Sequence, residues 1–507
     1  MRRALRGRVR AVLFMTALAL AALSASVLSA GAFASPSNSG DPEASNVARP
    51  VVTGPITGGI HGFPFDSSTL PLEQLHGYTE REYFIAGTAT SYTNVGALTP
   101  DGRWTVKPSS TATYKTRILV RRPTDPEKFN GTVIVEWLNV SQGLDTGPDW
   151  DTSHEEFMRA GYVWVGVSAQ AVGVNGFPPG NPAGNAGALK VWDPVRYASL
   201  VHPGDSFSYD IYSQAGQALR HPRGVNPLPD FKIKNLIADG ESQSAFRMVT
   251  YIDAIAPLAK LYNSYMVHSR GTSAAPLSQA PQASIPAPTP ALFRTDLHVP
   301  VMVFQSESDL ITLGYFADRQ PDSEFFRDWE TAGTPHADKY LLAFGFVDVQ
   351  KSLPQRQVNL CDQPINDGPM HYVFNAAYAA LNLWVRSGVA APHAPRIDIV
   401  PGTPPTIVRD SFGIAIGGIR TPDVDVPVST LTGLGNTPAN GCQIFGITTP
   451  FSQATLKQLY GTENGYVSKV SSDVLRDVQE GFILRVDAKE IIETAVVFRL
   501  GNPRAGV

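Results

Sequence analysis

A strand-turn-helix signature around residue 242 constrains the fold more than any other feature of this chain. An apolar run, residues 236–238, leads into Gly240-Glu241-Ser242-Gln243-Ser244, and a helix-like segment follows from Ala245 to Leu258. Such a turn exposes the serine hydroxyl as a nucleophile. The residues two positions before and after it are small, because bulky side chains there would strike the strand or the helix. The usual second glycine is replaced here by the small Ser244. We therefore predict Ser242 as a nucleophile, against the alternative of an ordinary helix N-cap serine.

Two carboxylates are candidate partners for this serine. The order serine, acid, histidine is expected after such a turn. A buried-strand pattern over residues 299–304 ends in a polar turn that carries Glu307 and Asp309. Asp309 is favoured because it lies a few residues beyond the strand end, and Glu307 stays the alternative.

A histidine follows the next strand-like segment, residues 325–330. That segment ends in a Gly333-Thr334-Pro335 turn, which delivers His336 to a loop. Its neutral imidazole could take the Ser242 proton and pass it to a leaving group. We therefore predict His336 as the general base. Three other histidines are ranked below it: His202, His268 and His371.

A serine nucleophile also needs two backbone N–H donors for the oxyanion that its attack creates. Gln243, the residue after the nucleophile, is the first expected donor. The strand predicted over residues 131–138 runs into a turn-rich loop, where Val140 or Ser141 is the second. Ser168 follows another strand but leads into a Gly- and Pro-rich segment, so we predict a structural role for it.

Several longer blocks spread from about Tyr78 to Gln443. They read GTVIVEWLNVS, GYVWVGVSAQ, HPGDSFSYDIYSQAG, IADGESQSAFRMVTYIDAI, VPVMVFQSESDL, RDWETAGTPHAD and GGIRTPDVDVP. In these blocks the chain resembles a large, mostly uncharacterised bacterial family of alpha/beta-hydrolase-domain proteins. The resemblance implies an α/β fold with a mostly parallel sheet flanked by helices, and Ser242 and His336 in the catalytic positions. It also makes Asp205 and Asp210 candidate substrate-side groups, although such residues more often cap a helix.

The first 34 residues are predicted to be a signal peptide. Five arginines precede an apolar stretch, residues 11–28, and Ala32-Phe33-Ala34 forms a small-residue cleavage site. A retained membrane anchor is the alternative, since the stretch is near spanning length, but its interior serines and the Ala-x-Ala ending favour cleavage. Removing the arginines leaves 36 basic against 45 acidic residues, a net charge of −9. We expect a secreted, periplasmic or extracellular protein with no stable membrane insertion and no nucleic-acid partner.

The only two cysteines, Cys361 and Cys442, are predicted to form a disulfide, because an exported protein matures in an oxidising compartment. A bridge across so long a loop is worth about 4 to 5 kcal/mol on the chain-entropy model. The alternative is two separate buried thiols. Neither cysteine belongs to a C-x-x-C pair, so metal or redox catalysis is not expected, and no cofactor is implied.

Strand-like and helix-like segments alternate as far as His336, which predicts a mostly parallel sheet covered by helices. The hydrophobic content of 43% and the charged content of 17% suffice for a large core. An Ala-, Pro- and Ser-rich loop, residues 272–290, is expected to be an exposed excursion or part of a lid rather than core. The C-terminal extension is expected to act as a cap or a buttress. The predicted organisation is a signal peptide (1–34), a flexible tail (35–50), an alpha/beta-hydrolase domain (51–400) and a C-terminal extension packing on it (401–507).

These features predict a secreted serine hydrolase that cleaves a carboxylic ester, in a small molecule or a polymer, through an acyl-enzyme. An amidase or acyltransferase of the same fold is the alternative, and so is a non-catalytic binding module on this scaffold. A metal-dependent hydrolase using His336 and Asp338 is disfavoured, because no second histidine lies at ligand spacing. The sequence sets no oligomeric state.

Overall fold

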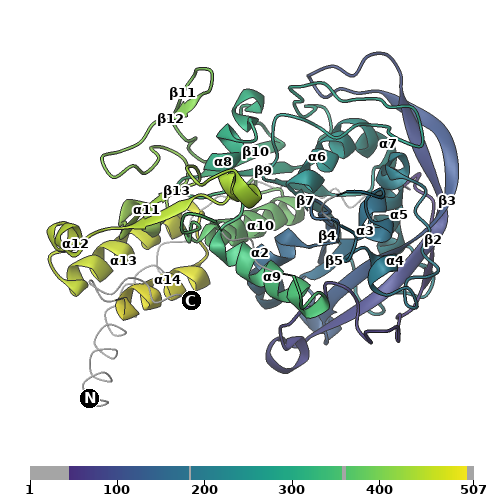
Figure 1. Cartoon of the computed structure of the whole chain (residues 1–507), viewed down its shortest axis with the longest axis horizontal. Helices are drawn as coiled ribbons and strands as arrows, with labels where there is room; N and C mark the ends of the chain where they lie inside the picture. Colours follow the sequence, from purple (N-terminus) through teal and green to yellow (C-terminus); the bar gives the residue numbers. More distant parts are fainter. Residues whose placement is uncertain (1–44, 182–183, 357–360, 499–507) are drawn as a thin grey trace. The chain divides into compact units, whose positions relative to one another are not determined.

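A ten-stranded sheet is the centre of the fold (Figure 1). The computed structural model describes residues 45–181, 184–356 and 361–498. The predicted signal peptide therefore lies outside the described residues, as does most of the predicted tail. The strands lie in the order β10-β9-β8-β7-β4-β5-β3-β2-β1-β6. Neighbours from β10 to β5 are parallel, whereas β5, β3, β2 and β1 pair in antiparallel fashion.

The strands of this sheet are β1 (Val51–Thr53), β2 (Tyr78–Asn94), β3 (Val106–Pro123), β4 (Thr132–Trp137), β5 (Val163–Val167), β6 (Arg223–Gly224), β7 (Asn235–Glu241), β8 (Ser264–His268), β9 (Val301–Ser306) and β10 (Phe326–Thr331). Two hairpins lie outside it: β11 (Ile399–Val400) with β12 (Thr406–Ile407), and β13 (Ser429–Thr432) with β14 (Ile447–Pro450). The first hairpin spans the predicted boundary at residue 400.

The helices are α2 (Pro148–Arg159), α3 (Ala171–Asn175), α4 (Leu189–Trp192), α5 (Ser208–Arg220), α6 (Gln243–Thr250), α7 (Ala256–Ala259), α8 (Glu307–Ile311), α9 (Lys339–Ser352), α10 (Met370–Ser387), α11 (Pro422–Asp425), α12 (Gln453–Tyr460), α13 (Glu463–Glu480) and α14 (Arg485–Val497). The helix predicted from Ala245 to Leu258 is broken, because a π-helical turn, Tyr251–Ile255, separates α6 from α7. Pro257 in the first turn of α7 has no N–H to continue a regular helix.

Both faces of the parallel strands are buried, as helices on each side require. In β4, Val133 and Val135 pack in one core cluster with residues of α5 and α6. Ile134, between them, packs in a second cluster with residues of α2 and α10. Successive side chains of a strand point to opposite faces, so α5 and α6 cover one face and α2 and α10 the other. The predicted mostly parallel sheet flanked by helices is therefore confirmed.

The loop at residues 272–290 contributes to the core, contrary to the expectation from its composition. Leu277 is fully buried, and the hydroxyl of Tyr209 on α5 donates to the carbonyl of Pro276 at 2.7 Å. Ser278 and Ile285 form an isolated antiparallel bridge within it. This loop therefore contributes Leu277 to the core without forming a regular helix or strand.

The C-terminal residues pack against the elements that precede them. Helices α12, α13 and α14 share an apolar cluster with Tyr372 of α10. Asp487 of α14 pairs with Arg159 at the end of α2, with a distance of 2.8 Å between Nη2 and Oδ2. The backbone of Ile419 continues the sheet beyond β10, since its N–H donates to Glu330 O at 2.7 Å. The extension thus contacts both a flanking helix and the edge strand.

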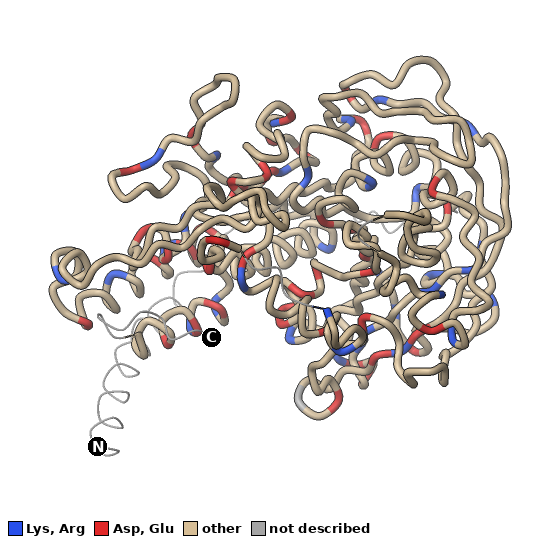
Figure 2. Tube along the Cα trace, viewed as in Figure 1, with Lys and Arg blue, Asp and Glu red and all other residues tan. Residues whose placement is uncertain are grey.

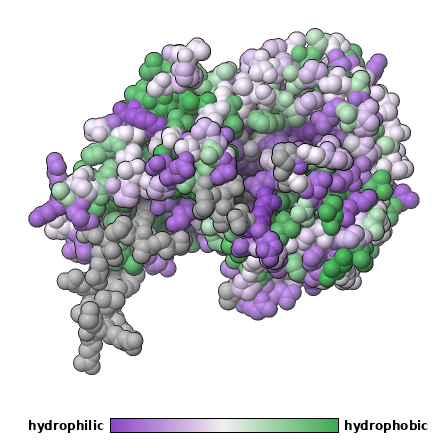
Figure 3. Space-filling view, viewed as in Figure 1, coloured by the Kyte–Doolittle hydropathy of each residue, from purple (hydrophilic) through white to green (hydrophobic). Residues whose placement is uncertain are grey.

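Acidic and basic residues are interspersed along the described chain (Figure 2). On the face shown in Figure 3, hydrophobic residues gather over the β11–β12 hairpin. Val400 of β11 is exposed. Within the described residues, no helix combines the length and the apolar character that crossing a membrane demands.

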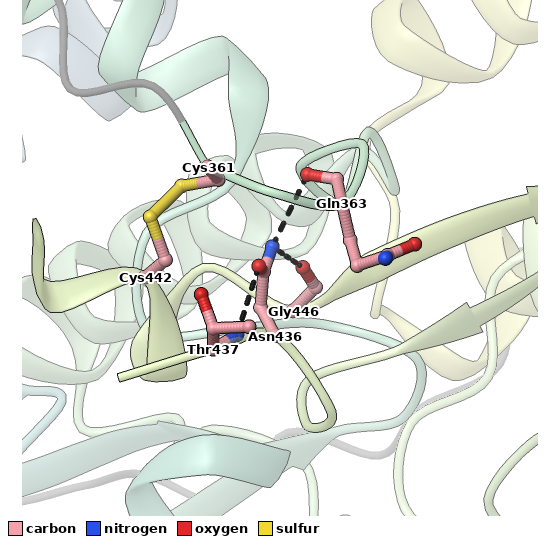
Figure 4. The surroundings of a disulfide bond; sticks show 6 residues. All are labelled: Cys361, Gln363, Asn436, Thr437, Cys442 and Gly446. Carbon is pink, nitrogen blue, oxygen red and sulfur yellow. Dashed lines mark hydrogen bonds between the residues drawn. A yellow bond between two sulfur atoms is a disulfide. The ribbon is translucent and has the colours of Figure 1, made fainter. Parts of the chain in front are cut away.

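The predicted disulfide is present between Cys361 and Cys442, which confirms that prediction (Figure 4). The bond joins positions 81 residues apart. Asn436 lies beside it and donates its amide N–H groups to Gly446 O at 2.9 Å and to Gln363 O at 3.4 Å. The covalent bond and the amide therefore hold the same two segments together.

Replacing both cysteines by serine should lower the free energy of unfolding by about 2 to 5 kcal/mol, because the unfolded chain regains the entropy that the bridge removes. Chemical denaturation of the oxidised wild type and the double variant measures this. Wild type unfolded in the presence of reductant is the matched control and should resemble the variant. Equal denaturation midpoints for all three samples would contradict the prediction.

Candidate active site

Ser242 lies at a sharp turn between β7 and α6. Its backbone has φ 56° and ψ −115°, a conformation that costs a non-glycine residue energy and that clusters at functional sites. The N–H of Ser242 donates to His268 O at 3.0 Å, which ties the turn to β8. A Cβ added at Gly240 would lie 3.0 Å from Ser244 Cβ, so the turn requires glycine at one position and a small residue at the other. This explains why serine serves in place of the second glycine.

Three residues form a continuous hydrogen-bonded chain at this turn. The Nε2 atom of His336 is 2.9 Å from Ser242 Oγ, and its Nδ1 atom is 2.6 Å from Asp309 Oδ1. His336 and Asp309 are buried. Ser242 follows β7, Asp309 lies in α8 just after β9, and His336 follows β10, so the carboxyl ends of three parallel strands supply the chain. Such an arrangement can remove the proton from a serine hydroxyl and stabilise the imidazolium that results.

Asp309 is fixed by donors on its other oxygen. Its Oδ2 accepts from Ser306 N and Ser306 Oγ, both at 2.7 Å, and from Ser269 Oγ at 2.9 Å. The bonds with Ser306 form a capping box at the start of α8. The carboxylate is therefore held in one orientation while Oδ1 faces the imidazole.

Glu307 is bonded elsewhere. Its Oε1 accepts from Gly333 N at 2.7 Å, and its Oε2 accepts from Arg409 Nη2 at 2.7 Å and from Gly433 N at 3.0 Å. The side chain thus joins the loop before His336 to the C-terminal extension. The structure brings Asp309, not Glu307, to the imidazole.

A further carboxylate touches His336 and was missed by the sequence analysis. Glu241 Oε1 lies 3.1 Å from His336 Nε2, on the side of the ring opposite Asp309. Burial disfavours the charged imidazolium, but the Asp309 and Glu241 carboxylates outweigh that effect and raise the pKa of His336 to about 10. The signal was the position of Glu241, which directly precedes the predicted nucleophile.

The expected oxyanion donors lie in two loops. Gln243 is the first residue of α6, where a backbone N–H has no partner within the helix. The N–H of Ser141 donates to Asn139 Oδ1 at 2.8 Å, so it is already engaged. Asn139 also donates through Nδ2 to Glu241 Oε2 at 2.9 Å, which ties this loop to the turn at Ser242. Of the two residues expected after β4, Val140 is the one whose N–H remains a candidate.

The competing histidines have other partners or stack on rings. His268 ends β8, and its Nδ1 is 2.6 Å from Asp149 Oδ1. His202 Nε2 is 2.9 Å from Ala169 O. The ring of His371 stacks on Tyr340, with 3.7 Å between ring centroids. None of these side-chain contacts reaches Ser242, which His268 meets only through its backbone carbonyl.

Ser168 lies in a buried polar network, where Arg117 Nε donates to its Oγ at 2.9 Å and its hydroxyl donates to Asp145. Asp338 caps α9, because its Oδ1 accepts from Leu341 N at 2.8 Å. Within the part of the chain that the structure describes, no group of three or more His, Cys, Asp or Glu residues is placed to hold a metal ion.

Asp205 and Asp210 do not cap α5, although Asp205 Oδ1 accepts from the N–H of Ala171, the first residue of α3, at 2.7 Å. Asp205 Oδ2 accepts from Arg247 Nη2 at 3.0 Å, and Arg247 lies in α6, five residues after Ser242. Asp210 lies inside α5 and accepts from Thr90 N at 2.8 Å. Asp205 thus belongs to the polar groups around α6, whereas Asp210 joins α5 to β2.

A family model described as "Alpha/beta hydrolase domain" matches residues 52–493. No curated protein matches the chain. A solved structure of fungal esterases from Rhizomucor miehei is similar at 13% identity and a TM-score of 0.26, covering 58% of this chain and 83% of that one. A glucuronoyl esterase from Solibacter usitatus is similar at 10% identity and a TM-score of 0.28, covering 62% and 88%. Likenesses this low say nothing about what this chain acts on. The match over residues 52–493 shows that the chain belongs to the alpha/beta hydrolase domain family.

Proposed function

We propose that the protein is an exported serine hydrolase that cleaves carboxylic esters through an acyl-enzyme, with Ser242, His336 and Asp309 as its catalytic triad. The observation that carries the proposal is the unbroken hydrogen-bonded chain from Ser242 Oγ through His336 to Asp309, at a strained turn between a strand and a helix. The disulfide between Cys361 and Cys442 supports export, because such bonds persist in oxidising compartments.

Acylation would begin with attack of Ser242 Oγ on the ester carbonyl carbon. As that bond forms, the hydroxyl proton moves to His336 Nε2, and the carbonyl oxygen becomes an oxyanion that the N–H groups of Gln243 and Val140 stabilise. Collapse of the tetrahedral intermediate breaks the bond to the alkoxy oxygen. That oxygen takes the proton from Nε2 and leaves as an alcohol.

Deacylation would repeat these steps with water. His336 Nε2 accepts a proton as the water oxygen bonds to the acyl carbon, and the proton then returns to Ser242 Oγ as the carboxylic acid leaves. Asp309 keeps the Nδ1–H of His336 in place throughout and stabilises the imidazolium without taking its proton.

A fluorophosphonate probe tests the proposal, because it reacts only with an activated serine. The purified mature protein should form an adduct on Ser242, mapped by peptide mass spectrometry, and the His336→Ala variant should label far more slowly. An absent adduct in a folded sample, or an adduct on another serine, would contradict the proposal and favour a binding module.

Hydrolysis of an amide and transfer to an alcohol use the same acyl-enzyme. Product analysis with an ester and an amide of the same acyl group, in water with and without added alcohol, separates the three reactions. Ester cleavage to the free acid as the main reaction is the expected result. Faster amide cleavage, or a transferred ester as the main product, would assign the chemistry to the alternatives.

A further inference from the structure

Glu241 approaches the same imidazole nitrogen as the predicted nucleophile. Its Oε1 is 3.1 Å from His336 Nε2, and Ser242 Oγ is 2.9 Å from that atom. The other oxygen of Glu241 accepts from Asn139 Nδ2 at 2.9 Å, and Asn139 Nδ2 also donates to the Glu241 carbonyl at 3.2 Å. The side chain is buried, so the contact is held by packing and by the loop after β4.

When Glu241 is ionised, its contact with His336 is favourable only if the imidazole is protonated at Nε2. With the Nδ1–H of His336 donated to Asp309, the neutral ring presents a lone pair at Nε2, and a carboxylate oxygen beside a lone pair is repelled. Once Nε2 has taken a proton, the same oxygen becomes an acceptor for it. A carboxylate at this position therefore favours the imidazolium over the neutral base.

We propose that Glu241 is a positioning residue that acts through His336: a second carboxylate that pairs with the Nε2–H of the imidazolium and sets the pH range in which Ser242 is activated. The inference rests on the proposed serine-hydrolase function. In that reaction the proton on Nε2 comes from Ser242 and goes to the leaving alkoxide. Glu241 neither gains nor loses a proton.

Among the described residues, Asp309 and Glu241 act directly on the His336 ring, and His268 and Asp338 lie behind them. Asp309 bonds to Nδ1, and Glu241 faces Nε2. His268 lies at the end of β8, where burial lowers its pKa to about 4, so its ring stays neutral at ordinary pH. Asp338 caps α9, and burial raises its pKa to about 6. A Glu241 variant leaves Asp309, His268 and Asp338 unchanged. A difference between its pH profile and that of wild type is therefore due to Glu241.

The sign of the expected effect follows from the charge. A general base works only when it is unprotonated, so activity is lost as the pH falls through the pKa of His336, which the two carboxylates raise to about 10. Removing the charge of Glu241 lowers this pKa. The acid limb of the pH profile should then move toward acid by about one pH unit or more.

The test compares wild type with Glu241→Gln, which keeps the side-chain length and an acceptor for Asn139. The second-order rate of labelling by the fluorophosphonate probe is measured from pH 5 to pH 11, so that the profile extends past the wild-type limb. Glu307→Gln is the matched control, because it neutralises a buried carboxylate at the start of α8. This carboxylate bonds to Gly333, Gly433 and Arg409 and not to His336. The acid limb should move for Glu241→Gln and stay for Glu307→Gln. An unmoved limb for Glu241→Gln overturns the inference.

Glu241→Asp separates charge from structure. It keeps the carboxylate but moves it away from Nε2, so its acid limb should fall between those of wild type and Glu241→Gln. A purely structural role predicts reduced rates with the wild-type limb in both variants. Should Glu241→Gln fail to fold, Glu241→Asp carries the test, and an unmoved limb there overturns the inference.

A readout without turnover distinguishes this inference from the proposed function. The Nδ1–H proton of His336, hydrogen-bonded to Asp309, is followed by proton NMR as a function of pH and identified by its loss in His336→Ala. A titration that moves toward acid in Glu241→Gln supports the role of Glu241 even if no ester is cleaved. If Ser242 is labelled but the titration of the His336 proton does not shift in Glu241→Gln, the hydrolase proposal stands and the inference about Glu241 is overturned.

Discussion

Replacing Ser242 by alanine should lower kcat for a short activated ester by about 10⁴-fold or more. The change removes the oxygen that His336 Nε2 faces at 2.9 Å and adds nothing to the turn. Because the side chain loses one atom and the backbone keeps its conformation, the thermal unfolding midpoint should stay close to that of wild type. Hydrolysis of p-nitrophenyl acetate and a thermal melt of each protein measure the two effects.

Ser168→Ala is the matched control for that experiment. Ser168 also follows a strand at its carboxyl end, and it is buried, but it bonds to Arg117 and Asp145 rather than to a histidine. Its loss leaves Arg117 Nε without this partner, so the unfolding midpoint should fall while hydrolysis persists. Retained hydrolysis in Ser242→Ala, or loss confined to Ser168→Ala, would refute the assignment of Ser242.

The sheet was predictable because its strands carry strong local patterns. The apolar run at residues 299–304 became β9, and the segment at residues 325–330 became β10, each shifted by one or two residues. Strands buried on both faces are apolar along their whole length, which marks them without knowledge of their neighbours. The order of the strands then brought Ser242 and His336 to the same edge of the sheet.

Side-chain partners were harder to predict than elements. Glu307 and Asp309 are two residues apart, so the alternation of a strand would put both on the same face and could not separate them. In the structure both lie in the short helix α8. The spacing of Ser306 and Asp309 was the signal available, since a capping box orients the second residue back toward the first. The contact of Glu241 with His336 spans 95 residues of sequence, so apart from the position of Glu241 beside Ser242 no local pattern indicates it. The catalytic roles of Ser242, Asp309 and His336 stay predictions.

The contribution of the C-terminal extension was not predictable from local sequence at all. Arg409 and Gly433 bond to Glu307, which in turn bonds to Gly333 just before His336. The bonds of Arg409 and Gly433 with Glu307 join residues 102 and 126 positions apart, so they depend on the folded sheet rather than on propensity. They place the extension against the loop that carries His336.

Replacing Asp309 by asparagine should lower kcat by about 10⁴-fold with little change in KM. The amide of asparagine can present N–H groups to His336 Nδ1, and this favours the tautomer that carries its proton on Nε2, where it cannot accept one from Ser242. The bonds from Ser306 and Ser269 to the other oxygen can persist, so the fold should survive. Steady-state hydrolysis and a thermal melt give kcat, KM and stability.

Glu307→Gln is the decisive comparison for Asp309→Asn, because Glu307 was the other candidate acid. It removes the charge that pairs with Arg409, so the free energy of unfolding should fall, while kcat should stay within about tenfold of wild type. The Ser242→Ala/Asp309→Asn double variant should be no slower than Ser242→Ala alone, since residues that act as one unit are not additive. A larger loss of kcat in Glu307→Gln than in Asp309→Asn would assign the role of the acid to Glu307. Additive losses of kcat in the double variant would mean that Asp309 does not act through the hydrogen-bonded chain of Ser242 and His336.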